Sequence, residues 1–426
     1  MKTKLILAQF FIAALIRAQI WSPLGVGNEF TSNVWTIAED QQNATIYFGG
    51  CFDTLRGLGV HHAGKWFQND YDSVGSGINV GSNYGIMASA VYNNEWYVGG
   101  KFNLAGGVPA NNVARWNGSQ WLSLSGGVNN TVRAMAVFNG QLFIGGDFTK
   151  VNGQTIYYLA KWNGTQWIYP AIAINGAVND LEVLGSDLYI CTNTCIIRYD
   201  GTFTYQLANQ GGKSIAVYNN EVYVGGTFPA FDGIPGTRGI VKYNGLAWQS
   251  VGGGITAINS PFFYGIYDME EYNGKLFVGG SFTKMGATIA SNIANWNGNS
   301  WSAMGSGTNN PVLTLAEINS ELLVGGDFTL AGGQAINFLA RWVEPMGIDD
   351  PTVLQSNIFP NPSFGIFTIE AENGELEIYN SLGELVYAKK IEQPQTKLDL
   401  SNKAKGLYHL ILRNENEVFT QKIVIR

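Results

Sequence analysis

The hexapeptide Phe143-Ile-Gly-Gly-Asp-Phe148 belongs to a pattern that recurs along the chain and decides its fold. In each copy an apolar stretch ends in Gly-Gly and an aromatic residue follows. The first glycines stand at positions 49, 99, 145, 225, 279 and 325, so the interval from 145 to 225 is clearly longer than the others. A degenerate copy at Leu188-Tyr-Ile-Cys191 divides that interval, which gives seven units. A fixed period of this length indicates a repeat architecture.

Each unit is predicted to form four short antiparallel strands. In the third unit, residues 132–138 form an apolar strand, and Asn139-Gly140 is a strong hairpin signal that leads into a second strand at 141–145. A longer loop precedes a third strand at 158–162, and a fourth strand follows around Trp167. Four antiparallel strands per repeat are typical of propeller blades. We therefore predict an all-β chain with a seven-bladed β-propeller of four-stranded blades.

The two ends of the repeat region predict a closed ring. The last unit stops at Arg341-Trp342 and lacks its fourth strand. The segment Trp21-Ser-Pro-Leu-Gly-Val-Gly27 matches the fourth-strand segment Trp301-Ser-Ala-Met-Gly-Ser-Gly307 of the preceding unit. We expect the N-terminal strand to complete the last blade, which removes exposed sheet edges. The propeller would then span residues 19–343.

Paired aromatic residues accompany the Gly-Gly motif, as in Ala114-Arg-Trp-Asn-Gly-Ser-Gln-Trp121. Together these residues resemble the kelch and galactose-oxidase-like propellers, in which an aromatic pair on the third and fourth strands follows Gly-Gly. The chain departs from kelch repeats by its Trp-Asn-Gly-x-x-Trp turn. The resemblance implies the fold and says little about function. We interpret the repeated Trp116, Trp162, Trp296 and Trp342 as packing between blades, and the alternative is that they are platforms for sugars.

The N-terminal residues 1–18 have the features of a secretory signal peptide. Lys2 and Lys4 precede an apolar stretch at 5–16, and the small residue Ala18 fits a cleavage site. An uncleaved anchor is the alternative interpretation. No other apolar run approaches the length of a membrane-spanning helix, so we expect no transmembrane segment in the mature chain. The net charge of −7 argues against a nucleic-acid partner.

The chain changes character after Val343, where charged residues become more frequent. We predict a linker at 344–357 and a small β-sandwich at 358–426. Its motifs, from Ile358-Phe-Pro-Asn-Pro-Ser-Phe-Gly365 to the terminal Lys422-Ile-Val-Ile-Arg426, resemble the C-terminal sorting domain of the type IX secretion system of Bacteroidetes. The resemblance rests on Pro360, Asn361, Pro362, Gly365, Gly383, Gly406, Tyr408 and Lys422.

That resemblance implies a route of export. The sorting domain would engage the type IX secretion machinery, and the protein would pass through the periplasm to the outer cell surface or the medium. We expect the exported protein to be a monomer.

The candidate ligand site lies where the first strands of the units begin, at one end of the central channel. Counting back twelve residues from each Gly-Gly, and two more in the first unit, aligns one residue per unit. Polar and aromatic side chains at a channel mouth could hold a glycan or an acidic peptide, and the alternative is that they only fill the channel. The aligned residues are Trp35, Met87, Arg133, Asn179, Lys213, Tyr267 and Leu313, of which Trp35, Arg133, Asn179, Lys213 and Tyr267 are the candidate ligand-binding residues.

Catalytic and metal chemistry finds little support in the sequence. The chain has three histidines, too few in the propeller for a copper-radical oxidase. Asp147 and Asp327 recur after Gly-Gly, but other residues occupy that position elsewhere, which argues against a repeated calcium site. We predict no catalytic residues, no metal and no cofactor.

Cys191 and Cys195 flank a short loop in the degenerate fourth unit. Residues beside a three-residue hairpin loop can be cross-strand neighbours, and export permits oxidation, so we predict a disulfide between them. The alternative is two reduced, buried thiols, with Cys51 buried likewise.

We predict that the protein is a secreted or cell-surface binding or adhesion module whose ligand is a glycan or a protein. Two other functions are the alternatives. One is a secreted carbohydrate-active hydrolase or lyase that uses the face with the longer loops, and the other is a structural surface-layer component. An enzyme should bring acidic or histidine side chains together in one pocket, whereas a binding module should present aromatic and amide side chains.

Overall fold

The computed structural model describes residues 20–25, 30–79, 85–260, 264–343, 357–371, 374–380, 384–391, 393, 395–413 and 418–426. The chain divides into two compact units, Met1–Val343 and Glu344–Arg426. Within the described residues the secondary structure is β-strand, without helices. Accordingly, no described segment forms a helix long and apolar enough to cross a membrane.

The described part of the first unit contains seven four-stranded antiparallel sheets, numbered here in chain order. The first to third sheets are β2 (Val34–Asp40), β3 (Thr45–Gly50), β6 (Ala63–Phe67) and β7 (Asp70–Ser73); β9 (Ile86–Tyr92), β10 (Glu95–Gly100), β13 (Val113–Trp116) and β14 (Trp121–Ser123); and β15 (Val132–Phe138), β16 (Gln141–Gly146), β19 (Leu159–Trp162) and β20 (Trp167–Ile168).

The remaining sheets follow the same order of strands. The fourth to seventh are β21 (Val178–Leu184), β22 (Asp187–Thr192), β23 (Ile196–Tyr199) and β24 (Thr204–Ala208); β25 (Ser214–Tyr218), β26 (Glu221–Gly225), β27 (Ile240–Tyr243) and β28 (Trp248–Ser250); β30 (Gly265–Tyr272), β31 (Lys275–Ser281), β34 (Ile293–Trp296) and β35 (Trp301–Ala303); and β36 (Val312–Ile318), β37 (Glu321–Gly326), β40 (Leu339–Val343) and β1 (Ile20–Ser22).

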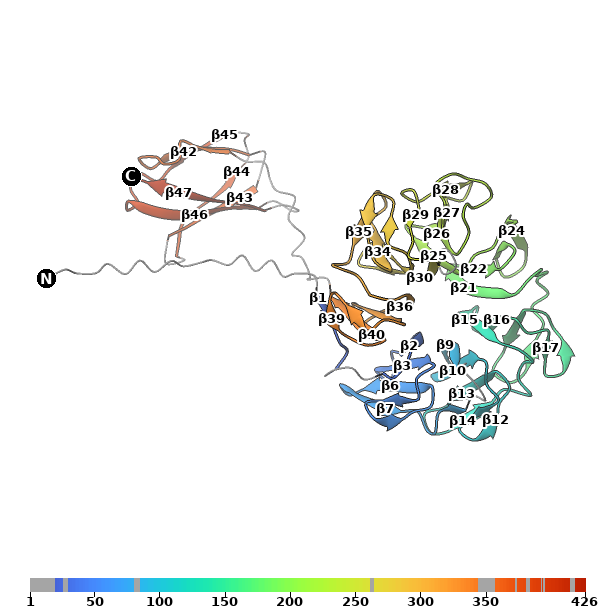
Figure 1. Cartoon of the computed structure of the whole chain (residues 1–426). Helices are drawn as coiled ribbons and strands as arrows, with labels where there is room; N and C mark the ends of the chain where they lie inside the picture. Colours follow the sequence, from blue (N-terminus) through green and yellow to red (C-terminus); the bar gives the residue numbers. More distant parts are fainter. Residues whose placement is uncertain are drawn as a thin grey trace. The chain divides into compact units, whose positions relative to one another are not determined.

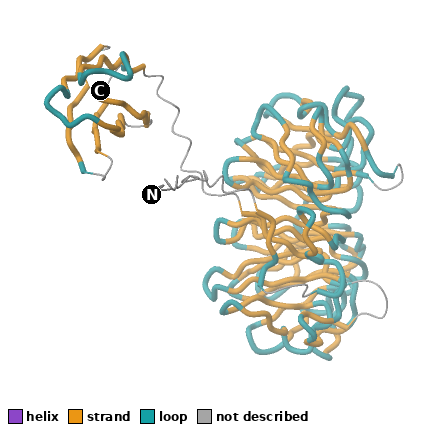
Figure 2. Tube along the Cα trace, turned by 60° about the vertical axis from the view of Figure 1, so that its left-hand side comes forward, coloured by secondary structure: helices purple, strands orange, loops and turns teal. Residues whose placement is uncertain are grey.

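The sheets stand around a common axis in the manner of propeller blades (Figure 1). Each first strand contacts the first strands of the two neighbouring sheets. Because β36 of the seventh sheet contacts β2 of the first, these contacts form a closed circle. The second strands are buried on both faces because a neighbouring sheet lies on either side. Figure 2 shows the strands inside this unit and the connecting loops around it.

The N-terminal strand completes the seventh sheet, as the sequence predicts. β1 pairs with β40 in the register Trp21↔Trp342 and Ser22↔Arg341. The Trp21 indole lies edge-on to that of Trp342, with ring centroids 5.0 Å apart, and its Nε1 donates to the Met304 carbonyl of the sixth sheet at 3.0 Å. Both chain ends of the repeat region therefore contribute to one sheet.

The Gly-Gly motif allows neighbouring sheets to approach closely. A Cβ atom on Gly145 would lie 2.3 Å from Cγ1 of Val178, the first residue of β21. A Cβ on Gly146 would lie 2.1 Å from the Thr131 carbonyl oxygen. Any larger residue must therefore displace its neighbour, which explains why the pattern recurs at this position.

The hairpins between first and second strands have the conformation that their sequence predicts. Asn139 and Gly140 both adopt positive φ, 49° and 68°, as a type I′ turn requires. Asn93-Asn94, Asn219-Asn220 and Asn273-Gly274 repeat this geometry.

The repeated tryptophans pack within and between sheets, as predicted. Trp121, Trp167, Trp248 and Trp301 each donate their indole N–H to a carbonyl of the preceding sheet. Third-strand and fourth-strand indoles form tilted pairs, such as Trp296 with Trp301, whose centroids are 5.1 Å apart. These bonds link the second, third, fifth and sixth sheets each to the sheet before it.

The described part of the second unit forms a three-stranded and a four-stranded antiparallel sheet. Side chains of both sheets, among them Phe367, Ile369, Ile378 and Leu410, form one buried core. The strands are β41 (Asn357–Phe359), β42 (Ile366–Glu370) and β45 (Gln395–Asp399), and β44 (Leu385–Ile391), β43 (Gly374–Asn380), β46 (Gly406–Arg413) and β47 (Val418–Ile425).

Candidate functional site

The first strands bring all seven aligned mouth residues together. Six of these strands carry a register shift against their second strand, which leaves one extra, unpaired residue in each. In the fifth sheet Lys213 directly precedes β25 and occupies the equivalent place. The residues Trp35, Met87, Arg133, Asn179, Lys213, Tyr267 and Leu313 line one cavity of about 220 Å³, called here the mouth cavity.

The two cations of the mouth cavity differ in their partners. Arg133 forms a forked ion pair with Asp147: its Nε lies 3.0 Å from both carboxylate oxygens and an Nη lies 2.7 Å from Oδ2. Lys213 is exposed and has no ion pair among the described residues. The carboxylate of Asp147 thus serves Arg133, and Lys213 is the cation available to a ligand.

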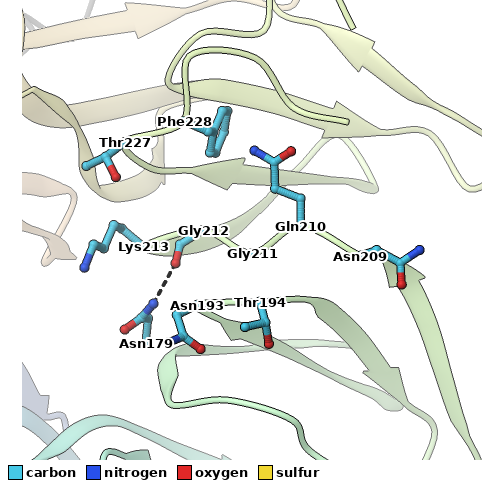
Figure 3. Close-up of a pocket in the computed structure, with 10 residues that line it drawn as sticks. All are labelled: Asn179, Asn193, Thr194, Asn209, Gln210, Gly211, Gly212, Lys213, Thr227 and Phe228. Atoms are coloured by element: carbon cyan, nitrogen blue, oxygen red, sulfur yellow. Dashed lines mark hydrogen bonds between the residues drawn. The ribbon is translucent and has the colours of Figure 1, made fainter. Parts of the chain in front are cut away.

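A second and larger cavity, of about 540 Å³, opens beside the mouth (Figure 3). We call it the seam pocket because it lies between the fourth and fifth sheets. Lys213 and Asn179 lie at one end of it and belong to the mouth cavity as well. Its lining consists of Asn179, Asn193, Thr194, Asn209, Gln210, Gly211, Gly212, Lys213, Thr227 and Phe228.

Several of these side chains are held by hydrogen bonds. Asn179 Nδ2 donates to the Gly212 carbonyl at 2.7 Å. Gln210 bridges two points of the fifth sheet, because its Nε2 donates to the Ala230 carbonyl at 2.9 Å and its Oε1 accepts from Asp232 N at 2.7 Å. These hydrogen bonds hold the side chains of Asn179 and Gln210 in place in the pocket wall.

The seam pocket lies between the two sheets, the fourth and the fifth, that lack a small hairpin present in the five other sheets. In those sheets a small hairpin follows the second strand and pairs with the segment that enters the sheet, as Leu104 of the second sheet pairs with Asn79. The hairpins are β4 (Thr54–Leu55) with β5 (Leu58–Gly59), β11 (Leu104–Ala105) with β12 (Val108–Pro109), β17 (Lys150–Val151) with β18 (Gln154–Thr155), β32 (Lys284–Met285) with β33 (Thr288–Ile289), and β38 (Leu330–Ala331) with β39 (Gln334–Ala335).

In the fourth sheet only a tight turn through Asn193 and Thr194 joins β22 to β23. In the fifth sheet a loop with one isolated bridge, Phe231↔Ile234, stands in place of the hairpin. The segment that enters this sheet, residues 209–213, therefore pairs with no hairpin. Amide and hydroxyl side chains line the space instead.

Four carboxylates lie further along two first strands, and sequence reasoning missed them as a group. They are Asp180 and Glu182 of β21 and Asp268 and Glu270 of β30, on either side of β25. Burial, aided by repulsion from Asp268, raises the pKa of Asp180 to about 7. Burial, aided by repulsion from Asp180, raises the pKa of Glu182 to about 8. Burial likewise raises the pKa of Asp268 to about 6 and that of Glu270 to about 8.

The two aspartates bind backbone groups of neighbouring strands. Asp180 accepts from Leu181 N at 2.8 Å and, across the seam, from Ile215 N at 2.9 Å. Asp268 repeats this with Met269 N and with Leu315 N of the seventh sheet. The signal was present in the alignment, because these residues stand one and three positions after the mouth residues.

The predicted disulfide is absent, and the register of the fourth sheet explains why. None of the three cysteines, all of them among the described residues, forms a disulfide. Cys191 pairs with Ile196, whereas Cys195 O accepts from Thr192 N, so the two cysteines are not opposite each other. Cys191 packs into the core between the fourth and fifth sheets and Cys195 into that between the third and fourth. The alternative of buried thiols is correct for this pair, while Cys51 is half-buried.

In the second unit the sorting motifs meet beside the last strand. Asn361 Nδ2 donates to the Lys422 carbonyl at 2.7 Å, and its Oδ1 accepts from Val424 N at 3.0 Å. Gly365 O accepts from Leu400 N, and the Tyr408 hydroxyl donates to the Ala404 carbonyl. Pro360 and Pro362 flank Asn361, Gly406 pairs with Ile425 in β47, and Gly383 lies outside the described residues.

Comparison with known families agrees with this second unit. Residues 357–426 match the family model of the secretion system C-terminal sorting domain. This segment is a type IX sorting domain. The sorting domain directs the protein through the type IX secretion system to the cell surface or the exterior.

One curated relative shares a short stretch with the chain. The ulvan lyase NLR42 of Nonlabens ulvanivorans is 28% identical over 85 residues, which are 19% of this chain and 16% of that enzyme. The chain thus matches only a small part of this relative.

Solved structures resemble the chain in fold alone. The extracellular domain of a putative one-component system from B. thetaiotaomicron aligns with 95% of this chain and 53% of its own, with a TM-score of 0.52 and 13% identity. PorZ, a surface component of the type IX secretion system of Porphyromonas gingivalis, gives 0.48 at 13% identity over 95% of this chain and 60% of its own. The WD40 propeller domain of Doa1 gives 0.49 at 12% identity over 77% and 98%.

Proposed function

We propose that this protein is an extracellular binding or adhesion module built on a closed, seven-bladed β-propeller. In this proposal residues 1–18 are a signal peptide, 19–343 the propeller, 344–357 a linker and 358–426 the sorting domain, folded as a small β-sandwich. The ligand is a glycan or a protein segment. It binds at the mouth cavity and the adjoining seam pocket.

One observation carries this proposal: two cavities that share Asn179 and Lys213 are lined by side chains suited to binding. Amides, hydroxyls and an ammonium group line the seam pocket together with the phenyl ring of Phe228. Ligand sites of this kind combine a concave shape with a few placed polar groups. The pocket is also set apart from the other seams by its missing loop.

A second candidate function, a carbohydrate hydrolase or lyase, is favoured by the four carboxylates with raised pKa values. Perturbed carboxylates gather at catalytic sites. However, Asp180 and Asp268 each accept two backbone N–H bonds, and the four acids are not among the residues that line either cavity. Their contacts serve the junction of neighbouring sheets, so the binding role has the stronger support.

Binding of the full chain to a glycan array tests the proposed role. The variant Thr227→Trp places an indole in the seam pocket and should abolish binding, whereas Thr165→Trp, on an exposed turn elsewhere, should leave it intact. Binding that both variants retain would place the ligand elsewhere. Turnover of a bound saccharide that Glu182→Gln and Glu270→Gln abolish would favour the enzyme.

Removal of residues 358–426 tests the export route. In a host with the type IX system the truncated chain should accumulate in the periplasm, because the sorting unit is missing. Cell fractionation with an antibody against the propeller measures this. Surface display of the truncated chain at the level of the full chain would contradict the assignment.

A further inference from the structure

We propose that the seam pocket binds an anionic saccharide, with its carboxylate or sulfate group on Lys213 and its hydroxyls on the side-chain amides. This inference rests on the proposed binding function and specifies the chemistry of its ligand. Four observations lead to it.

The first observation is the unequal use of the two cations. Arg133 is neutralised by Asp147 through three short contacts, whereas Lys213 has no such partner among the described residues. Lys213 belongs to both cavities, so an anion bound to it can reach either. A free ammonium group at the junction of two cavities favours a ligand with a negative charge.

The second observation concerns the neutral polar groups. Asn193, Thr194 and Asn209 are exposed along the pocket, and Thr227 is exposed on the opposite wall. Side-chain amides both donate and accept, which matches hydroxyl groups that also do both. Phe228 supplies an apolar surface next to them.

The third observation separates a saccharide from an acidic peptide. An extended peptide binds mainly through main-chain hydrogen bonds to an open strand edge. Around Lys213 three backbone N–H groups are already used: Asn193 N donates to Ala177 O, Gly212 N to Thr192 O and Lys213 N to Gly225 O. At this end of the pocket side chains therefore supply the groups for a ligand, which favours a hydroxyl-rich one.

The fourth observation concerns the neighbouring acids, which would repel an anion if fully charged. They lie outside the pocket lining, and burial raises the pKa values of Asp180 and Glu182 to about 7 and about 8. At neutral pH these groups therefore carry only part of their negative charge.

Isothermal titration of the full chain with three oligosaccharides tests the inference. The probes are an oligogalacturonate, a sulfated galactan oligomer and a neutral galactan oligomer of equal length. We expect the carboxylated or the sulfated probe to bind at least about tenfold more tightly than the neutral one, with an affinity that falls as salt rises. The two anionic probes show which charged group the pocket prefers.

Variants assign the effect to the pocket. Lys213→Met should weaken binding of the anionic probe about tenfold and leave the neutral probe unchanged, and Lys213→Arg should restore most of the affinity. Lys150→Met, which removes an exposed lysine of β17, is the matched control and should change neither. A thermal melt of each variant verifies folding, and the salt dependence of the unmodified chain provides a readout independent of the variants.

Three results would overturn the inference. Equal binding of neutral and anionic probes without salt dependence would remove the anionic preference but leave the binding function. Binding of a polyglutamate peptide with no binding of any saccharide would replace the ligand class. No binding of any probe would count against the proposed function as well.

Discussion

The third and fourth sheets each pack closely against the sheet that follows, but the small and the large residue at the contact have exchanged places. In the third sheet Gly145 faces Val178 of the next sheet, and a Cβ on that glycine would lie within 2.3 Å of the valine. In the fourth sheet Cys191 takes the place of the glycine, and Gly212 takes the place of the valine. The bulk has moved from one side of the seam to the other. The fourth sheet could therefore lose its motif and its hairpin without losing the close approach of sheets.

The largest effect on stability is expected when the seam between the third and fourth sheets receives the residues found in the seam between the fourth and fifth sheets. Gly145→Cys alone should lower the free energy of unfolding by about 2–3 kcal/mol, because the added side chain overlaps Val178. Adding Val178→Gly should recover most of that loss, since all the closest contacts of the added Cβ are with Val178. Chemical denaturation of the two single variants and the double variant measures the coupling. Additive losses would contradict the exchange.

The second prediction concerns the position three residues after the mouth residue, which is Ala136 in β15 and Glu182 in β21. The third sheet has no titratable group at this position, whereas the fourth has one. Because burial raises the folded-state pKa of Glu182 from 4.5 to about 8, the protein should lose stability as pH rises from about 4.5 through 8. Glu182→Gln should raise the free energy of unfolding by about 1 kcal/mol at pH 8.5 and leave it unchanged at pH 4. Melting temperatures of the parent chain and the variant across this range measure the effect. An equal shift at both pH values would exclude titration as the cause.

Filling the open side of the fourth seam is expected to affect stability less. Replacing the Asn193-Thr194 turn with the third-sheet hairpin of residues 147–157 should change the unfolding free energy by under about 1 kcal/mol, because long surface insertions are tolerated. The same graft should abolish binding to the seam pocket. Retained binding at full affinity would show that the open seam is not the site.

The smallest effect concerns the cysteines. Since Cys191 and Cys195 are free thiols on opposite faces of the fourth sheet, a reducing agent should leave the melting temperature unchanged. Thiol titration of the denatured, unreduced protein should find both. Fewer thiols, together with destabilisation on reduction, would restore the disulfide.

The sequence predicted the repeated elements well because their signals are local. Asn139-Gly140 sets its turn through backbone conformation, and counting from Gly-Gly located all seven mouth residues. The failures concern relations across the seams. Periodicity does not show that Cys191 and Gly212 take the places of Gly145 and Val178. Nor does it show that Asp180 lies close to Asp268. The disulfide failed for a related reason, since a shift of one residue in register turns a side chain to the other face.

The pairing of β1 with β40 has a consequence for how the first unit is made. The seventh sheet cannot be completed until Val343 has been synthesised, although its partner Ile20 appears long before it. Contacts between such distant parts of a chain form slowly, because a long loop must close first. The pairing of β1 with β40 therefore closes the ring late, by joining the beginning of the repeat region to its end. Moving residues 20–25 to follow Val343 would turn this closure into a local hairpin and should speed refolding while preserving the ring.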